Sequence, residues 1–338
     1  MLKEFKFNLN QALSLIKIRE GKLKMSSETI PKLPIIDFNN LNLEAKSPNW
    51  ESVKSQVYKA LEEYGCFEAI LDKVPLDLRK TIFSSLEELF DLPLQTKQLN
   101  VSKKLHHGYL SQYPMLPLYE SIGIDDANIF ENVESLTNIL WPDGNQSFSK
   151  TVHTFSEELL ELDQIIRKMI LESLGVEKYL EEHMNSTSYL LRFMKYKGPQ
   201  TSDTKVGLKA HTDKNTVTIL YQNQVEGLEV MNKDGKWISY KPSLDSFVVL
   251  VGESLHAWSN GRLHSPLHRV MMSGNEARYS IALGSIPKEE CIIKAPDELV
   301  DDEHPLLFKP YVYDEFLKYF FSEKGQRDQF AMRTYCGV

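Results

Sequence analysis

The sequence predicts a mainly β fold with flanking helices, because the two halves of its 338 residues differ in hydrophobic pattern. From 33 to 180 the pattern is mostly helical, whereas after 187 short β-rich runs follow one another at close, regular spacing. No strand–helix–strand alternation occurs and no glycine-rich phosphate loop follows a strand, which disfavours a dinucleotide-binding or P-loop fold. We therefore expect the second half to form a β-sandwich, a jelly roll or a barrel.

The first half is expected to begin with a short strand and to continue mainly as helices. Apolar residues at i, i+4, i+7, i+8 and i+11 from Val53 lie on one helical face, and Gly65 predicts a turn before the next strand. The expected elements are a strand at 33–38, a helix through 53–64, a strand at 64–71, and helices at 76–91 and 148–174. The last helix has a continuous apolar stripe, so we expect it to back a sheet.

The second half contains short runs rich in β-branched, aromatic and other apolar residues. The expected strands lie at 188–196, 216–221, 228–231, 237–240, 246–251, 268–272 and 278–286. Asp234-Gly235 and Asn260-Gly261 are typical hairpin turns between such strands. A short aromatic helix is expected at 313–322.

Composition and charge are those of an ordinary soluble globular protein, long enough to form a core of enzyme size. With 39 basic and 47 acidic residues the formal charge is −8, which gives no general attraction to nucleic acid. No apolar run approaches the roughly 20 residues of a membrane span. Three widely spaced cysteines form neither a metal motif nor a disulfide framework, which suits a reducing compartment. We expect a cytoplasmic monomer that binds neither nucleic acid nor membrane.

The run GLKAHTDKNTVTILY contains the first candidate metal ligands. His211 and Asp213 are two residues apart, and in an extended segment such residues project from the same face. His268 begins a predicted strand 57 residues later, and distant strands become neighbours in a rolled sheet. His256 and His264 compete with His268 as the third ligand. Two imidazoles and a carboxylate form the facial set of non-haem Fe(II) oxygenases, with three positions open for a chelating 2-oxo acid and O₂.

A candidate anion site follows ten residues after His268. Arg278 and Ser280 lie at i and i+2 of an apolar strand and face the same way. An inward-facing arginine is costly unless it meets an anion, and its planar fork binds a carboxylate through two parallel hydrogen bonds. The alternative is a buried structural salt bridge with an acidic side chain. After a metal set at this distance, the distal carboxylate of 2-oxoglutarate is the favoured partner.

Several motifs resemble those of plant Fe(II)/2-oxoglutarate-dependent dioxygenases. LKAHTD, NGRLHSPLHRV and ARYSIALGSIP are similar to the family's iron-site and co-substrate motifs. LPIIDF, LEEYGCFEA and FDLPLQTKQ are similar to its N-terminal region, and the likeness covers about 33–322. ALEEYGCFEAI, YESIGIDDAN and LHSPLHRVMMSG are most similar to the AOP-type branch of alkenyl- and hydroxyalkyl-producing enzymes, which itself resembles the auxin dioxygenases.

The resemblance implies a double-stranded β-helix core, which is a jelly-roll, cupin-like fold, with an N-terminal α/β region. The resemblance also implies four parts: an extension at 1–30, a mostly helical region at 31–180, the catalytic core at 181–300, and a covering helix and tail at 301–338. Residues 1–25 carry a local charge of +4 and form either an extension before a second start at Met25 or an amphipathic targeting segment.

The resemblance also implies roles for individual residues. His211, Asp213 and His268 match the iron ligands, and Arg278 with Ser280 matches the 2-oxoglutarate clamp. Tyr196 falls where many members present a tyrosine to the co-substrate. The chain departs from the family pattern at Met194, where asparagine is frequent, so one co-substrate contact is in question. The candidates for contact with the substrate are Tyr119, Phe130, Phe193, Met194, Trp258 and Phe316.

The implied reaction couples oxidative decarboxylation of 2-oxoglutarate, giving succinate and CO₂, to oxidation of a small plant metabolite. Fe(II), 2-oxoglutarate and O₂ are the implied cofactors, with ascorbate as reductant. Hydroxylation is expected, either of a specialised-metabolite side chain or of a hormone such as indole-3-acetic acid. Three other interpretations are a zinc hydrolase that uses the same ligands, an ascorbate-dependent oxidase of the same fold, and a non-catalytic ligand-binding relative.

Overall fold

The computed structural model describes residues 32–39, 41, 47–111, 113–328 and 330–338. The chain divides into two compact units, Met1–Pro31 and Lys32–Val338, and all described elements belong to the second. The expected N-terminal extension, with its amphipathic segment, lies outside the described residues. None of the described helices is both long enough and apolar enough to cross a membrane.

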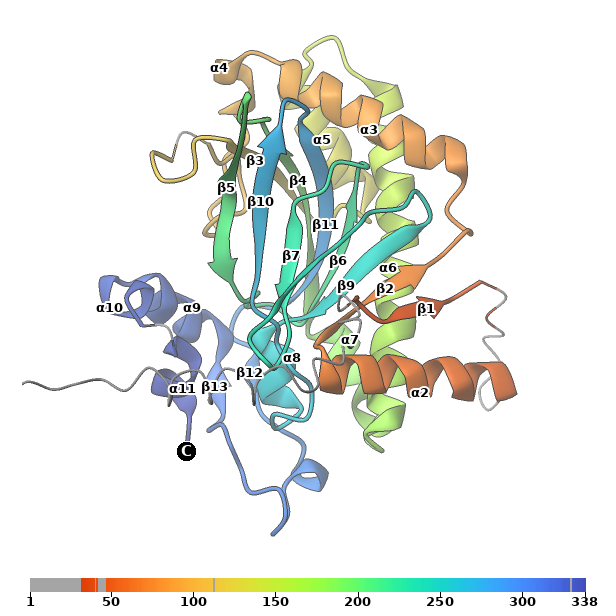
Figure 1. Ribbon diagram of the computed structural model, residues 1–338, viewed down its shortest axis with the longest axis vertical. Coiled ribbons are helices and arrows are strands. Elements are labelled where there is room, and N and C mark those ends of the chain that lie inside the picture. The colour runs from red at the N-terminus through yellow and green to blue at the C-terminus, as the bar shows by residue number, and fades with distance from the viewer. Residues whose placement is uncertain (1–31, 40, 42–46, 112, 329) are drawn as a thin grey trace, which may run out of the picture. The chain divides into compact units, whose positions relative to one another are not determined.

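Two sheets form the centre of the described unit (Figure 1). The larger sheet has the spatial order β1 (Ile35–Asp37), β2 (Cys66–Ile70), β9 (Ser246–Val251), β6 (Val217–Gln222), β11 (Arg278–Pro287), β4 (Thr187–Tyr196) and β3 (Tyr119–Asp125). The smaller sheet has the order β5 (Thr201–His211), β10 (His268–Gly274), β7 (Leu228–Met231) and β8 (Trp237–Ser239). All neighbouring pairs are antiparallel except β1 with β2.

The chain crosses between the two sheets along its second half. From β4 to β11 it passes alternately through the larger and the smaller sheet, with the β7–β8 hairpin as one visit to the smaller. Apolar side chains from both sheets, among them Leu220 and Val248 in the larger and Leu228 and Val270 in the smaller, form one buried cluster. The sheets therefore face each other, and the expected jelly-roll core with its N-terminal α/β region is confirmed.

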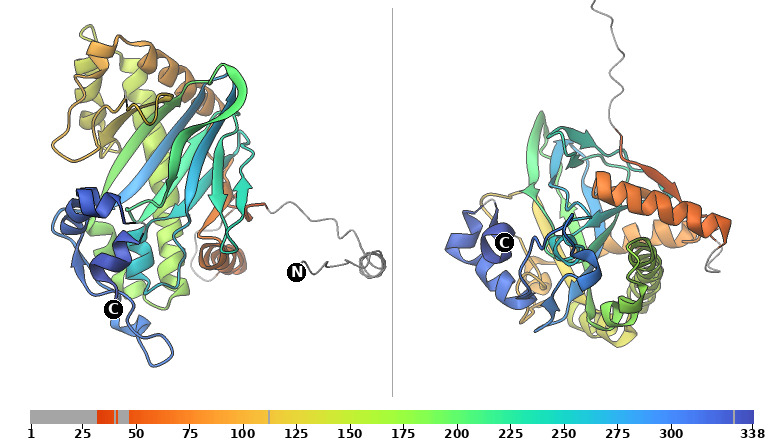
Figure 2. Two further views of the ribbon diagram at one scale, coloured as in Figure 1. Left: turned by 60° about the vertical axis from the view of Figure 1, so that its left-hand side comes forward. Right: turned by 90° about the horizontal axis from the view of Figure 1, so that it is seen from below.

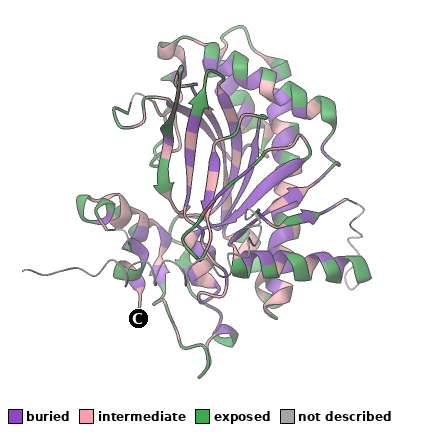
Figure 3. Ribbon diagram, in the orientation of Figure 1, coloured by how far each residue is buried: buried purple, intermediate pink, exposed green. Residues whose placement is uncertain are grey.

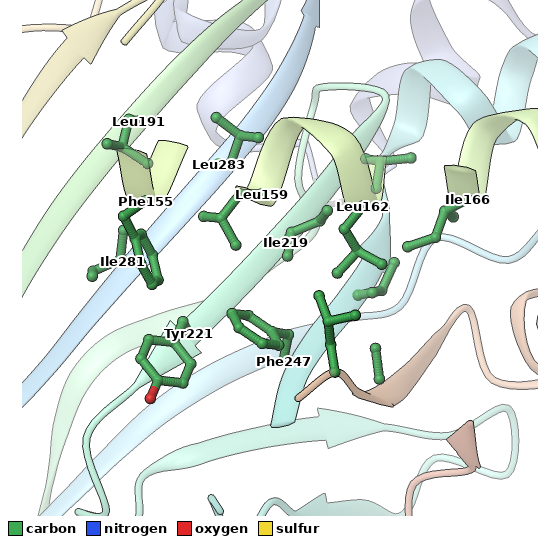
Figure 4. Packing of buried hydrophobic residues seen from close by; sticks show 14 of the residues in the cluster. Phe155, Leu159, Leu162, Ile166, Leu191, Ile219, Tyr221, Phe247, Ile281 and Leu283 are labelled. Atoms are coloured by element: carbon green, nitrogen blue, oxygen red, sulfur yellow. The ribbon is translucent and has the colours of Figure 1, made fainter. Parts of the chain in front are cut away.

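Helices from the N-terminal half cover the outer face of the larger sheet. Their bounds are α2 (Pro48–Glu63), α3 (Leu76–Asp91), α5 (Phe130–Leu140) and α6 (Gln146–Ser173). Phe155, Leu159 and Leu162 of α6 point onto Ile219 and Leu283 of the sheet (Figure 4). Buried residues gather on the strands and on the sheet-facing sides of these helices (Figure 3). The expectation that the longest helix backs a sheet is confirmed.

The C-terminal segment forms a separate aromatic cluster. Its elements are β12 (Ile292–Ile293), β13 (Tyr311–Val312), α9 (Tyr313–Phe321), α10 (Glu323–Gln326) and α11 (Ala331–Cys336). Phe316 of α9 is buried against Tyr311 and Tyr335. These helices and α2 with α6 lie on opposite sides of the sheets (Figure 2). The remaining short helices are α4 (Leu94–Lys97), η1 (Glu177–Tyr179), α7 (Leu180–Asn185), α8 (Glu253–Trp258) and η2 (Asp297–Leu299).

Three local expectations were incomplete or wrong. β3 and β5 were not anticipated, because each contains a glycine and several polar residues, which weaken the signal of a strand. Asn260-Gly261 is a turn, but it follows α8 and closes no hairpin. The Asn260 side chain donates to the carbonyl oxygens of Leu299 and Pro305, so the chain turns toward the C-terminal segment.

Candidate active site

Antiparallel pairing of β5 with β10 in the smaller sheet brings the two predicted histidine ligands together. His211 is the last residue of β5 and His268 the first of β10, and the two are directly opposite each other in the register. Their ring centroids are 4.3 Å apart. Asp213 follows in the turn after β5, and its Oδ1 is 3.7 Å from Nε2 of both His211 and His268. In the described part of the chain these three side chains, hereafter the metal triad, offer donor atoms within 4.8 Å of one another.

Backbone and side-chain hydrogen bonds fix the orientation of each member of the triad. His211 Nδ1 is 2.8 Å from the Lys209 carbonyl oxygen, and His268 Nδ1 is 3.2 Å from that of Pro266. A carbonyl accepts only from a protonated nitrogen, so Nε2 of each ring carries the free lone pair that faces the triad. The Thr218 hydroxyl on β6 donates to Asp213 Oδ2 at 2.6 Å, which leaves Oδ1 directed at the imidazoles.

The electrostatics of His211 and Asp213 favour the deprotonated forms that a metal requires. Burial lowers the pKa of His211 to about 4, and repulsion from His268 acts in the same direction. Burial alone raises the pKa of Asp213, but His268 and His211, the Thr218 hydrogen bond and Lys214 together outweigh it, and the net pKa lies below the ordinary value. At neutral pH the site therefore presents a neutral His211 ring and an Asp213 carboxylate.

Arg278 lies inside the same space with an incomplete set of partners. It is 1% exposed, and its Nη1 donates to Ser280 Oγ at 3.0 Å while its Nη2 donates to Gln222 Oε1 at 2.6 Å. Its buried Nε has no hydrogen-bond partner. Among the described residues no carboxylate lies within 4.0 Å of the guanidinium, so the structural salt bridge considered above is not formed. Burial lowers the pKa of Arg278, which is the cost of holding a cation in this position.

Cross-strand pairing places Tyr196 beside Arg278. Tyr196 of β4 is opposite Arg278 of β11, and the guanidinium carbon is 5.1 Å from the centre of its ring. Sequence reasoning missed Gln222 and Thr218. Both lie on β6 at alternate positions with Leu220, so the period of two in TVTILYQ was the available signal.

A cavity of about 530 Å³ contains the triad, Arg278, Ser280 and Tyr196. Two of the predicted substrate contacts, Tyr119 and Met194, also line it. Its remaining wall is mainly apolar and is made by both sheets, by the segment around 105–116 and by α9. The triad, Arg278 and the apolar wall therefore face one common space.

The other four predicted substrate contacts do not line this cavity. Phe193 alternates with Met194 on β4 and therefore faces the helical side, where it contacts Phe148. Phe316 is buried in the C-terminal aromatic cluster. Phe130 packs against His153, and Trp258 packs against His183. Strand alternation, in the first case, and the path of the helices, in the others, decide these positions.

The two competing histidines are also outside the cavity. His256 Nδ1 is 2.6 Å from the Leu263 carbonyl oxygen, and its ring contacts Phe308. The His264 backbone N–H donates to the Leu61 carbonyl oxygen. The carbonyl oxygen of His264 is only 2.2 Å from the position that a Cβ on residue 65 would occupy. Gly65 also has a φ of +72°, so this turn requires glycine on both grounds.

Comparison with known proteins agrees with this geometry. The family model of the 2OG-Fe(II) oxygenase superfamily matches residues 182–285, and that of the N-terminal region of a non-haem dioxygenase in morphine synthesis matches residues 33–115. A probable 2-oxoglutarate-dependent dioxygenase, AOP1.2 of Arabidopsis thaliana, is 53% identical over 322 residues, which cover 92% of this chain and 99% of the relative. The chain belongs to the 2OG-Fe(II) oxygenase superfamily. It is a 2-oxoglutarate-dependent dioxygenase similar to the AOP-type enzymes, as the resemblance implied.

Solved structures of this family have the same fold. The dioxygenase for auxin oxidation of rice is 28% identical with a TM-score of 0.78, and the match covers 90% of this chain and all of the rice chain. The 2-oxoglutarate complex of the corresponding Arabidopsis thaliana enzyme is 27% identical with a TM-score of 0.73, covering 81% of this chain and 99% of the other. Membership of the family implies Fe(II), 2-oxoglutarate and O₂ as cofactor and co-substrates.

Proposed function

We propose that this dioxygenase hydroxylates a small metabolite, with the metal triad holding Fe(II) and Arg278 with Ser280 and Tyr196 forming the 2-oxoglutarate site. The donor set fits Fe(II): two Nε2 atoms and one carboxylate oxygen face one point, and the opposite side is open to the cavity. Fe(II) with 2-oxoglutarate and O₂ supplies the oxidising chemistry, which releases succinate and CO₂. The protein's own groups bind, orient and exclude water.

The unsatisfied buried guanidinium is the observation that carries the co-substrate assignment. Arg278 has donors to spare at 1% exposure, and the described residues supply no anion to neutralise it. A carboxylate that enters the cavity gains charge-assisted hydrogen bonds without a further desolvation cost for the arginine. Ser280 and Gln222 hold the fork in place, and the Tyr196 ring covers its face. These are the features that a dicarboxylate co-substrate requires.

The substrate is proposed to lie against the apolar wall of the cavity, between the triad and α9. Tyr119 and Met194 are retained as proposed contacts, because both line this space. Two of the structural neighbours are dioxygenases for auxin oxidation, and the relative at 53% identity is an AOP-type enzyme. A specialised-metabolite side chain and a hormone such as indole-3-acetic acid are therefore the two proposed substrate classes.

The alternative functions have less support. A zinc hydrolase has no use for a buried cation beside the metal, and an ascorbate-dependent oxidase does not require a dicarboxylate clamp. A ligand-binding protein without activity is less compatible with a complete triad whose hydrogen bonds keep its donors aligned. We retain ascorbate as the reductant, a monomeric state and a cytoplasmic location as further parts of the proposal.

The decisive experiment is a metabolite screen of the purified full-length protein loaded with Fe(II). Succinate is measured together with the mass of every product, with and without 2-oxoglutarate. We expect stoichiometric succinate and a product heavier by one oxygen atom. Product formation that is independent of 2-oxoglutarate would contradict the proposed co-substrate, and hydrolysis of a substrate by the zinc-loaded protein would favour the hydrolase.

A further inference from the structure

A second arginine projects into the cavity at a distance from the co-substrate position. Arg192, Met194 and Tyr196 are alternate residues of β4, so their side chains share one face, and all three line the cavity. Tyr196 is opposite Arg278 of β11, whereas Arg192 is opposite Ala282. Four residues of antiparallel strand separate the two pairs by about 14 Å along the sheet. One carboxyl group cannot satisfy both arginines.

Arg192 has few partners for a guanidinium that is partly buried. Its Nη1 donates to the hydroxyl of Ser121 at 2.9 Å, and this is its one hydrogen bond to the described residues. Ser121 is itself fully buried on β3, so the bond fixes the direction of the side chain. Arginine has five N–H donors, which leaves one edge of the fork for another acceptor.

No acidic group in the cavity is available to neutralise Arg192. Asp125 is near enough for the Arg192 charge to contribute to its lowered pKa, but it forms its ion pairs elsewhere: its Oδ1 is 2.5 Å from His107 Nδ1 and 3.8 Å from Lys104 Nζ, and no ion pair joins it to Arg192 in the described part of the chain. Among the described residues that line the cavity, Asp213 is the only carboxylate, and it belongs to the metal triad. The described lining of the cavity therefore offers Arg192 no carboxylate partner.

The other cations of the cavity are accounted for. Lys214 pairs with Glu253 at 3.0 Å and lies over the Phe320 ring. His106 lies against the ring of Phe321 and is held in its neutral form, since burial lowers its pKa and Arg192 and His107 add to the effect. Arg192 is thus the one permanent cation that is neither paired with a carboxylate nor assigned to 2-oxoglutarate, within the described lining of the cavity.

Apolar side chains line the same cavity as this arginine. Leu190 precedes it on the same face of β4, and Leu110, Leu317 and Phe320 line the same cavity. Along the sheet, Arg192 is close to the position of Asp213. Arg192 is opposite Ala282 of β11. The next residue of β11 on the same face, Gly284, is opposite Thr218, whose hydroxyl donates to Asp213. A molecule bound at Arg192 shares the cavity with the triad.

From this arrangement we propose that the substrate is an organic oxyanion with an apolar body, and that Arg192 binds its carboxylate or sulfate group. This inference rests on the proposed function, and it narrows the substrate class of the same site. The Ser121 hydroxyl positions the fork, and the apolar wall takes the body of the substrate. Neutral analogues lose the ionic contact and leave a partly buried cation without a counter-charge.

The test measures binding by calorimetry under nitrogen to the full chain loaded with Fe(II) and 2-oxoglutarate. The probes are phenylacetate, phenyl sulfate and phenylacetamide, together with indole-3-acetate and indole-3-acetamide. We expect at least one oxyanion to bind at least about tenfold more tightly than its amide, which is the effect of a charge-assisted hydrogen bond. The comparison of phenylacetate with phenyl sulfate decides between a carboxylate and a sulfate. Equal binding of acids and amides, or binding of none, would overturn the proposal.

Variants separate recognition of charge from packing. Arg192→Gln should weaken the oxyanion at least about tenfold and change the amide by less than about twofold. Arg192→Lys, which keeps the charge but not the fork, should be intermediate. Arg327→Gln removes an exposed arginine outside the cavity and should change neither. An equal loss for acid and amide in Arg192→Gln would show a packing role and would overturn the proposal.

The affinity for 2-oxoglutarate distinguishes failure of the Arg192 proposal from failure of the proposed dioxygenase function. It should be unchanged in Arg192→Gln, and an increase in its Kd equal to that of the oxyanion would assign Arg192 to the co-substrate instead. If the wild-type chain does not bind 2-oxoglutarate and releases no succinate in the metabolite screen, the proposed function fails and this inference fails with it. If it binds 2-oxoglutarate without preferring oxyanions, the Arg192 proposal alone is overturned.

Discussion

Replacement of Arg278 tests the central electrostatic feature of the cavity. In the wild-type chain the guanidinium is already desolvated, held by Ser280 and Gln222, and without a carboxylate partner in the described part of the molecule. A 2-oxoglutarate carboxylate therefore gains the full attraction of a preorganised cation. Arg278→Ala should cost about 2–5 kcal/mol of co-substrate binding, the range for the loss of one partner of a buried charge pair. At about 1.4 kcal/mol per tenfold, this is an increase of roughly 30- to 4,000-fold in Kd.

The assay is titration of 2-oxoglutarate into the Fe(II)-loaded protein without oxygen, supported by thermal unfolding. Because a ligand that binds only the folded state raises its stability, 2-oxoglutarate should raise the Tm of the wild type and not that of the variant. Arg278→Met keeps most of the apolar volume without the charge and should lose as much affinity as Arg278→Ala. Arg269→Ala removes an arginine that pairs with Glu229 and lies over Trp237, and should leave the affinity unchanged. An unchanged Kd in both Arg278 variants would refute the clamp.

Further predictions concern the metal and the pH dependence of folding. Alanine at any position of the metal triad should abolish Fe(II) binding measured by metal analysis, whereas His264→Ala should retain it; equal loss in His264→Ala would refute the ligand assignment. Thr218→Val removes the hydrogen bond to Asp213 and should weaken metal binding about 10- to 100-fold in a Co(II) titration, while an unchanged affinity would deny Thr218 a role. Burial, with repulsion from Arg167, lowers the pKa of His183 to about 3 from an ordinary 6.5. The unfolded chain then binds more protons, so the free energy of unfolding should fall as the pH decreases below about 6.5 in urea titrations. His183→Gln should reduce this slope, and an identical slope would contradict the assignment.

Particular residues show how far the sequence could anticipate the site. His211, Asp213 and Ser280 were identified because their spacing of two residues from another candidate is a local property of extended chain. The approach of His211 and Asp213 to His268 depended on the register of β5 with β10, and β5 itself was not anticipated. The chain TSDTKVGLKAH is too polar to be recognised as a strand, and it is held by its pairing with β10.

The substrate-facing side of the site was less accessible to sequence reasoning. Phe193 and Met194 are neighbours in the chain, yet one faces the helices and the other the cavity, and only the position of the sheet between its two layers decides which. Arg192 is on the same face as Met194, but its lack of a carboxylate partner became evident only from its surroundings. Phe316 and Trp258 were placed by the packing of the C-terminal helices.

Local patterns in the sequence by themselves determined the strands and helices with strong periodicity, the identity of the ligand-bearing motifs and, through their resemblance, the family. The tertiary structure decided which distant side chains share the cavity, which arginine is left without a counter-charge, and which aromatic residues are turned away. The physical reason is that periodicity is encoded by neighbours along the chain. Strand register and layer order are instead set by the burial of surfaces that are far apart in the sequence.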